Sequence, residues 1–231
     1  PVFPKVTVDT EILIIQKNDK PNPNVNILVV DDLVVIENSN FKTNKVILHD
    51  QKKWIGLKGK VINIFTSKEE EDLSRKCLLV SAKLETLYDI NVGIKPYQTG
   101  KGKPPQTKET VKTRPFDSDK KSTPLHRPYL RGKDINRYVI QPLEPRFIKY
   151  GEWLAEPRQS ANFDAPVKLF MRQTGDSLIA TIDTDAFLCL NNMHVLVPKE
   201  KNPSPKYILG ILNSKLLNWY YHTLNPEVGE A

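Results

Sequence analysis

A long segment near the middle of the chain holds few side chains that could fill a hydrophobic core. It runs from Gly93 to Pro124, GIKPYQTGKGKPPQTKETVKTRPFDSDKKSTP, and is rich in Gly, Pro, Lys and Thr. Gly and Pro interrupt regular helices and strands, so we expect a long loop here. Long loops inside folded domains are usually functional, which makes this loop the first candidate for a site.

Two helical patterns flank this loop along the chain. The first covers about residues 68–87, where Ser67 is placed to cap the helix and three glutamates follow in the first turn. The second covers about residues 205–223 and has a serine cap and a proline in its first turn. Apolar runs with turn residues between them predict strands within residues 165–198. Together these patterns predict an α+β fold with short mixed or antiparallel strands, two main helices and a long basic loop.

The N-terminal stretch has a different character. Two apolar runs, over residues 5–17 and 24–39, are separated by a turn-rich cluster and predict two or three adjacent strands. The first helical pattern then separates them from the rest of the chain. We therefore expect two structural units, residues 1–66 and residues 67–231.

The positive charge of the chain is concentrated in and beside the loop. The whole chain has a net charge of +7. From Lys95 to Lys133 there are eleven Lys and Arg against three Asp and Glu, a local charge of +8 that leaves −1 for all other residues. A basic patch on a nearly neutral protein is typical of a phosphate-binding surface, because it attracts a polyanion locally. A solvated loop without a ligand explains the same charge, so both interpretations stay open.

Several classes of function lack their sequence signals. No apolar run is long enough to cross a bilayer and the first residues are not those of a signal peptide, so we expect a cytoplasmic protein with no membrane partner. Cys77 and Cys189 lie far apart and are expected to be buried thiols. The histidines are scattered, and the spacings of a metal cluster, a phosphate-binding glycine loop and a nucleophile elbow do not occur. We therefore predict no catalytic residue, no metal and no cofactor in this chain.

The stretch RPYLRGKDINRY, which follows the loop, combines basic with aromatic residues. Residues 132–138 are interpreted as a short helix, with Ile135 and Tyr138 facing inward and Lys133 and Arg137 facing outward. The outward charges are either ordinary solvated charges or contacts to phosphates and base edges. An Arg fork can read guanine with two hydrogen bonds, whereas Lys acts as a point charge.

Several blocks of the sequence resemble one known family. The blocks are VFPKVTVDTEILIIQK, NVGIKPYQTGKG, HRPYLRGKDINRYVI, VKLFMRQTGDSLIATIDTDAFLCLNNMHVLVP and KYILGILNSKLLNWYYHTLNPEVGE. In the same order and at similar spacing, such blocks occur in the C-terminal part of adenine-specific DNA methyltransferases. The resemblance is to the TaqI-like specificity domain, the target recognition domain of restriction-modification enzymes, and it covers nearly the whole chain.

The resemblance implies that this chain is one part of a larger enzyme. In the family, a catalytic domain binds S-adenosylmethionine and holds the flipped adenine with an Asn/Asp-Pro-Pro-Tyr motif, and the next domain recognises double-stranded DNA. That motif does not occur here, since the pair Pro104-Pro105 follows Lys103. Residues 1–66 then look like the last strands of the catalytic domain plus a connector, and residues 67–231 like the specificity domain.

The same resemblance sets expectations for activity and partners. The chain itself is expected to be catalytically inactive. S-adenosylmethionine would be the cofactor of the parent enzyme, an adenine-specific DNA methyltransferase that in some relatives is fused to a restriction endonuclease. The expected partners are double-stranded DNA and the catalytic methyltransferase domain of the same chain.

Two sets of side chains are predicted to contact DNA. Those expected at phosphates, which fix the register without reading sequence, are Lys95, Lys101, Lys103, Arg131, Lys133 and Arg137. Those expected at base edges, because Arg suits guanine and Gln suits adenine, are Gln98, Thr99, Arg172 and Gln173. Tyr97 either stacks on an unpaired base or packs under the loop. Arg172 and Gln173 have a second interpretation as the cap of a hairpin.

Two other classes of function stay open. In one, the chain is a protein-interaction module and its basic loop binds an acidic partner from a DNA defence complex. In the other, the chain is itself a nuclease, although no carboxylate cluster with a neighbouring lysine is recognisable in a strand of the sequence.

Overall fold

The computed structural model describes residues 24–28, 46–50, 67–201 and 203–225. By its contacts the chain divides into two units, Pro1–Glu71 and Asp72–Ala231. In the first unit, β1 (Asn24–Leu28) pairs antiparallel with β2 (Val46–Asp50). β1 lies within the predicted strand region 24–39, whereas the predicted strand region 5–17 lies outside the described residues. The assignment of residues 1–66 to the end of a catalytic domain stays a prediction.

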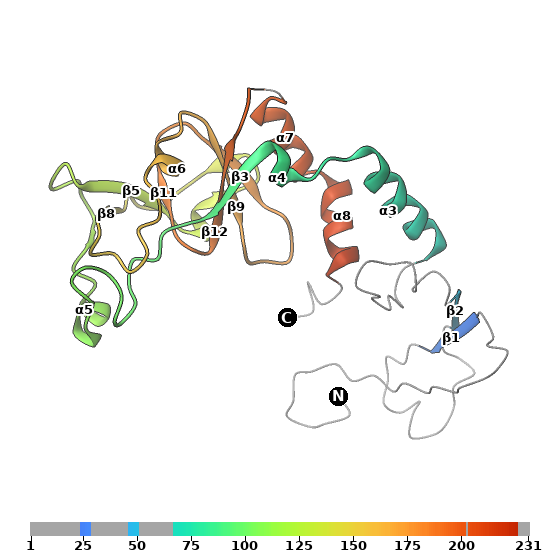
Figure 1. Ribbon diagram of the computed structural model, residues 1–231, viewed down its shortest axis with the longest axis horizontal. Coiled ribbons are helices and arrows are strands. Elements are labelled where there is room, and N and C mark those ends of the chain that lie inside the picture. Colours follow the sequence, from blue (N-terminus) through green and yellow to red (C-terminus); the bar gives the residue numbers. More distant parts are fainter. Residues whose placement is uncertain (1–23, 29–45, 51–66, 202, 226–231) are drawn as a thin grey trace, which may run out of the picture. The chain divides into compact units, whose positions relative to one another are not determined.

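The second unit is built on a four-stranded antiparallel sheet with the order β10–β9–β12–β3. Its strands are β3 (Tyr88–Val92), β9 (Lys168–Arg172), β10 (Ala180–Asp183) and β12 (Met193–Pro198). Figure 1 shows β3, β9 and β12 side by side at the centre of this unit. Three of the four strands come from the region 165–198 in which the sequence predicts strands.

A second sheet has the order β11–β5–β8–β4. Its strands are β4 (Asp117–Ser118), β5 (His126–Leu130), β8 (Phe147–Lys149) and β11 (Leu188–Cys189). β11 pairs parallel with β5, while the other pairs are antiparallel. The predicted α+β class with mixed and antiparallel strands is therefore confirmed.

The central sheet is apolar on both faces. Successive residues of a strand point to opposite faces, and in β9 Phe170 belongs to one buried cluster and Leu169 to another. The Phe170 cluster includes Leu130 and Ile148 from the second sheet. The Leu169 cluster includes Ile208 from helix α7 (Pro205–Leu212). The central sheet thus lies between the second sheet and α7, which explains the long apolar runs of its strands.

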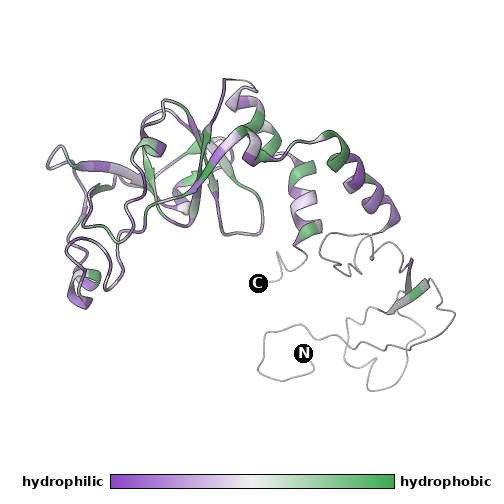
Figure 2. Ribbon diagram, viewed as in Figure 1, coloured by the Kyte–Doolittle hydropathy of each residue, from purple (hydrophilic) through white to green (hydrophobic). Residues whose placement is uncertain are grey.

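Each of the two predicted long helices is a pair of shorter helices. The first consists of α3 (Lys68–Val80) and α4 (Leu84–Leu87). Ser67 caps α3 as predicted: its hydroxyl accepts from the backbone N–H of Glu70 at 3.3 Å, and its own N–H donates to the Glu70 carboxylate at 2.7 Å. α3 has no buried residue, whereas Leu84 and Leu87 of α4 pack against the Leu169 cluster. Figure 2 shows a hydrophilic N-terminal part of α3 and hydrophobic residues at its C-terminal end.

The second long helix divides into α7 and α8 (Lys215–Leu224) at Asn213, whose side chain forms hydrogen bonds with the central sheet. The Asn213 amide donates to the carbonyl oxygen of Ala180 and accepts from its N–H, both at 2.9 Å. Asn218 of α8 accepts from the N–H of Leu178 at 2.9 Å. β10 is an edge strand, and its free backbone groups would otherwise be open to pairing with another chain. Asn213 therefore occupies the outward-facing backbone groups of Ala180, and Asn218 binds the backbone just before the strand.

No helix in the described part of the chain is long and apolar enough to cross a membrane.

Candidate nucleic-acid interface

One buried glutamine organises the loop that contains several of the predicted DNA contacts. We call residues 96–106 the Gln106 loop. The side chain of Gln106 accepts from the N–H of Gln98 at 2.9 Å and donates to the carbonyl oxygens of Pro96 and Trp153, both at 2.8 Å. Gln106 is only 5% exposed, so these three hydrogen bonds are shielded from water. They hold the two ends of the loop together and fasten it to the Trp153 segment.

The backbone of the Gln106 loop is closed by further hydrogen bonds. The N–H of Gly100 donates to the carbonyl oxygen of Gln106 at 2.9 Å, and the N–H of Gln106 donates to that of Lys101 at 2.8 Å. Gly102 has φ +88, and a Cβ there would collide with the carbonyl oxygen of Trp153, so glycine is required. Thr99, Lys101 and Lys103 face solvent, and Gln98 is half-buried.

Tyr97 packs beneath this loop. Its hydroxyl accepts from the N–H of Phe116 at 2.9 Å, and its ring stacks on that of Phe116 with the centroids 5.5 Å apart. The guanidinium of Arg114 lies 4.5 Å from the centroid of the Tyr97 ring. Burial, followed by the nearby charge of Asp117, raises the pKa of Tyr97 above its ordinary value. Of the two interpretations of Tyr97, the structure places it in the packing arrangement.

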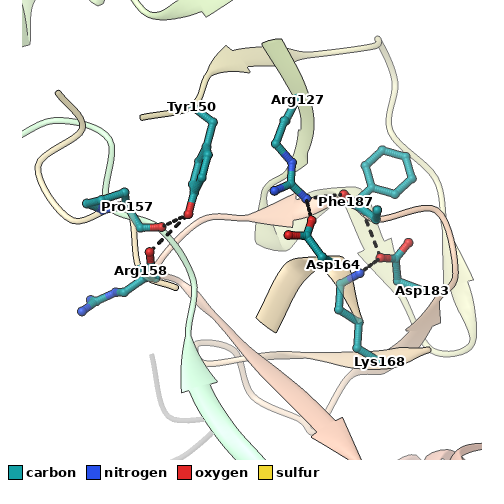
Figure 3. Close-up of polar contacts among 9 residues, drawn as sticks. Arg127, Tyr150, Pro157, Arg158, Asp164, Lys168, Asp183 and Phe187 are labelled. Atoms are coloured by element: carbon teal, nitrogen blue, oxygen red, sulfur yellow. Dashed lines mark hydrogen bonds and ion pairs between the residues drawn. The ribbon is translucent and has the colours of Figure 1, made fainter. Parts of the chain in front are cut away.

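The basic residues between Lys95 and Lys133 fall into two groups by their contacts. All three arginines pair with aspartates: Arg114 with Asp117 at 2.7 Å, Arg127 with Asp164 at 2.7 Å and Arg131 with Asp134 at 3.1 Å. Figure 3 shows the pair formed by Arg127 of β5 and Asp164 of α6 (Ala161–Asp164). Lys103 lies 3.6 Å from Glu152, with both side chains highly exposed. The lysines that form no ion pair with another described residue are Lys95, Lys101, Lys108, Lys112, Lys120, Lys121 and Lys133. The charge that remains to attract an anion is thus carried by lysines.

Two of these lysines are placed by the short helix α5 (Lys108–Thr113). The hydroxyl of Thr107 caps the helix by accepting from the N–H of Thr110 at 3.1 Å. Lys108 and Lys112 are four residues apart, so they lie on one face of the helix, and both are exposed. Both belong to the basic segment from Lys95 to Lys133, but neither is among the residues that the sequence predicts to contact DNA.

The predicted helix over residues 132–138 is wrong beyond Asp134. The structure has a 3₁₀ turn, η2 (Gly132–Asp134), followed by a hairpin of β6 (Ile135–Asn136) and β7 (Val139–Ile140). The chain reverses at Tyr138, which has φ 71. Ile135 is fully buried as predicted, but Tyr138 is 53% exposed instead of facing inward.

Arg172 holds this hairpin against the central sheet. Its Nε donates to the carbonyl oxygen of Gly132 at 2.7 Å, and its Nη2 donates to that of Ile135. The guanidinium fork is therefore engaged with the backbone of a different hairpin from the one that Arg172 was expected to cap. Gln173, the next residue, is exposed, and its N–H donates to the carbonyl oxygen of Asn192 at 2.9 Å.

Arg131 and Arg137 also make contacts within the protein. Arg137 donates to the carbonyl oxygen of Leu178 at 3.1 Å and to the side chain of Asn218 at 3.4 Å. Arg131 donates to Asp134 through its backbone N–H at 2.8 Å and through its guanidinium. Burial would raise the pKa of Asp134, but the hydrogen bonds and charge of Arg131 outweigh it and lower that pKa. Lys133, by contrast, is exposed.

A buried ion pair lies away from these surfaces. Lys168 of β9 and Asp183 of β10 contact each other with both side chains fully buried (Figure 3). Asp183 also accepts from the N–H groups of Asp185 and Phe187, both at 3.1 Å. The nearby Cys189 is fully buried, as predicted, and burial raises the pKa of its thiol, whereas Cys77 on α3 is only partly buried, so that its predicted burial is wrong. Since solvent does not reach it, the pair supports the fold and is not a binding site.

Sequence reasoning missed the hydrogen bonds between residues that are distant in the chain. Gln106 bonds to a residue 47 positions away and Arg172 to residues 40 and 37 positions away. No local pattern identifies such contacts. Among the residues that the structure describes, no group of three or more His, Cys, Asp or Glu is placed to hold a metal ion.

The comparisons with known proteins agree with the resemblance. Residues 127–231 match the family model of the TaqI-like C-terminal specificity domain. A Methanocaldococcus jannaschii protein that carries the name of a type II restriction enzyme and methyltransferase is 26% identical over 238 residues. That alignment covers 95% of this chain and 18% of the relative, so the chain spans less than a fifth of the relative's length. The resemblance read from the sequence is therefore confirmed, and residues 127–231 are similar to the TaqI-like C-terminal specificity domains.

Proposed function

We propose that this chain is the DNA target recognition part of an adenine-specific DNA methyltransferase of a restriction-modification system, acting in the cytoplasm. The family match and the name of the relative support this proposal. The observation that carries it is the set of exposed lysines without ion pairs around the Gln106 loop and α5. Lysine ammonium groups of this kind bind phosphates and release counterions.

The proposal assigns different roles to different side chains. Lys95, Lys101, Lys103 and Lys133, joined by Lys108 and Lys112 of α5, contact phosphates and set the register on the duplex. Gln98, Thr99 and Gln173 are the neutral candidates for base edges. Three arginines act from within the protein: Arg172 binds the carbonyl oxygens of Gly132 and Ile135 at the start of the β6–β7 hairpin, Arg137 ties the hairpin turn to Leu178, and Arg131 pairs with Asp134 in the preceding turn. The interface would then read sequence with amides and hydroxyls and gain affinity from lysines.

A separate grip on the duplex suits the chemistry of the proposed parent enzyme. Methylation of the exocyclic amine of adenine requires the base to leave the stack, which costs a few kcal/mol. This chain would hold the duplex during that step. S-adenosylmethionine and the catalytic groups would belong to the methyltransferase domain of the parent, which in some relatives carries an endonuclease as well.

The salt dependence of duplex binding tests the proposal. For the full chain, log Kd should vary steeply with log salt concentration, with a slope of about 0.9 for each phosphate neutralised. A variant with Lys101, Lys108, Lys112 and Lys133 all replaced by Gln should lose up to about 3.6 from that slope and bind every duplex sequence more weakly. The matched control replaces four exposed lysines on other elements by Gln: Lys68, Lys76, Lys206 and Lys215.

Two results would contradict the proposal. One is a wild-type chain whose duplex binding does not respond to salt. The other is an equal loss of affinity in the two four-lysine variants, because the binding would then depend on net charge alone. Capture of an acidic protein that survives nuclease treatment, without duplex binding, would instead favour a protein-interaction module.

A further inference from the structure

The tip of the β6–β7 hairpin presents an aromatic ring to solvent. Tyr138 is 53% exposed, and its neighbour Val139 is 48% exposed. Tyr138 has φ 71, a left-handed conformation that Gly, Asn and Asp adopt much more readily than a bulky side chain. A turn selected only for its geometry would favour one of those residues. Tyrosine at this position therefore points to a role for the ring itself.

The backbone that carries this ring is fixed on both sides. The N–H of Tyr138 donates to the carbonyl oxygen of Ala180 at 3.0 Å. The side chain of the preceding residue, Arg137, donates hydrogen bonds to Leu178 and Asn218. Arg172 holds the start of the hairpin. The turn that carries the ring is thus held in place by hydrogen bonds. Less conformational entropy is therefore lost when the ring contacts a ligand.

The charges beside the tip suit a polyanion. Lys133 is exposed on the turn that leads into the hairpin, and Asn136 is exposed on β6. The only carboxylate between residues 131 and 140 is that of Asp134, which is 2% exposed and paired with Arg131. A ligand here meets an aromatic face, an amide and a positive charge. Nucleic acid combines flat ring faces with phosphates and matches this chemistry.

We propose that Tyr138 contacts the duplex by stacking its ring on a deoxyribose or on a base at a step that opens when the protein binds. This inference rests on the proposed function and adds an aromatic contact, which neither the proposed lysines nor the neutral residues proposed for base edges supply. Aromatic stacking on bases contributes about 1–3 kcal/mol per base, so loss of the ring should weaken binding roughly 5- to 150-fold. Because no charge is involved, the slope of log Kd against log salt should not change.

The experiment compares two substitutions at this position in the full chain. Tyr138→Asn removes the ring and suits the left-handed backbone, so the melting temperature should stay equal or rise while duplex affinity falls roughly 10-fold. Tyr138→Phe keeps the ring and should bind within about twofold of wild type. Tyr207→Asn, at a 63% exposed tyrosine on α7, is the matched control and should not affect binding.

The results separate this inference from the proposed function. If the wild type binds duplex with the lysine-dependent salt slope and Tyr138→Asn binds as tightly, the role of Tyr138 is overturned and the proposed function stands. An equal loss in the Asn and Phe variants would also overturn stacking, because only the hydroxyl differs in the second. If the wild type does not bind duplex, both proposals fail.

Discussion

The Gln106 loop and the β6–β7 hairpin are both held in place by side chains that bind backbone groups, but these side chains are neutral in the loop and cationic in the hairpin. In the loop, the neutral amide of Gln106 binds the backbone, and the cations of Lys101 and Lys103 face solvent. In the hairpin, the cations of Arg137 and Arg172 bind the backbone, and neutral side chains such as Tyr138 face solvent.

The difference shows that a count of basic residues does not give the charge available to a ligand. An arginine fork matches a pair of carbonyl oxygens or a carboxylate and is weakly hydrated, so it is readily used inside a protein. A lysine ammonium is a strongly hydrated point charge and stays at the surface more often. We therefore expect the lysines of the loop to control salt-dependent affinity, and the hairpin to affect affinity and sequence preference without changing the salt dependence.

The largest stability effect should come from the neutral clamp of the loop. Gln106→Ala removes three hydrogen bonds and leaves the partly buried N–H of Gln98 and carbonyl oxygen of Trp153 without this partner, while the Pro96 carbonyl keeps its hydrogen bond from the N–H of Ala155. At about 1 kcal/mol for each bond, the free energy of unfolding should fall by about 3 kcal/mol or more. Urea denaturation measures this, with the exposed Gln141→Ala as the control, expected within about 0.5 kcal/mol. A cost near that of the control would show that the loop does not depend on this side chain.

A somewhat smaller cost is expected at the cationic clamp of the hairpin. Arg172→Ala removes the hydrogen bonds to Gly132 and Ile135 and should lower the free energy of unfolding by about 2–3 kcal/mol. Arg172→Lys should recover only part of this loss, because an ammonium cannot form the fork. The control Arg75→Ala removes a guanidinium that is 71% exposed and should change little.

The Arg172 variants also sharpen the comparison through DNA binding. Arg172 is proposed to hold the hairpin while other residues, such as Gln173, read the bases. Arg172→Lys should then reduce discrimination between cognate and altered sequences without changing the salt slope. A shift in preference confined to guanine positions, with unchanged stability, would instead restore the direct base-reading role that the sequence predicts for Arg172.

The parts of the fold that local patterns determine were predictable. The strands of residues 165–198 follow from apolar runs separated by turn residues, and the cap at Ser67 follows from the glutamates after it. The break between α7 and α8 was not predictable, because it depends on the hydrogen bonds of Asn213 with Ala180, 33 residues away. An asparagine inside an apolar helical pattern was the available signal.

The candidate site was likewise predictable only where local sequence determines it. The basic segment and its exposed lysines follow from composition, because charged side chains without partners stay in water. The roles of Arg137 and Arg172 did not follow, because their carbonyl partners belong to residues far away in sequence. The predicted helix over residues 132–138 failed because apolar residues three apart, Ile135 and Tyr138, fit a helix as well as a tight hairpin.

A smaller effect, which depends on pH, is expected at the turn before the hairpin. The pKa of Asp134 is lowered in the folded state, so its ion pair with Arg131 stabilises the protein fully above the unfolded pKa near 4 and is lost as pH falls through the folded pKa. Asp134→Asn should therefore cost about 1–2 kcal/mol at pH 7. The gap to wild type, measured by urea denaturation, should close as pH falls below about 4. A gap that is constant with pH would mean that the charge of Asp134 does not contribute.

The smallest effect is expected at the ion pair on the Gln106 loop. Lys103 and Glu152 are 3.6 Å apart with side chains 79% and 77% exposed, so water screens their attraction. Glu152→Gln should change the free energy of unfolding by less than about 0.5 kcal/mol. It should also strengthen duplex binding slightly, because it removes a negative charge beside a lysine expected at a phosphate. A clear loss of stability would show that Lys103 is committed to the protein, as the arginines are, and the contrast between the loop and the hairpin would no longer hold.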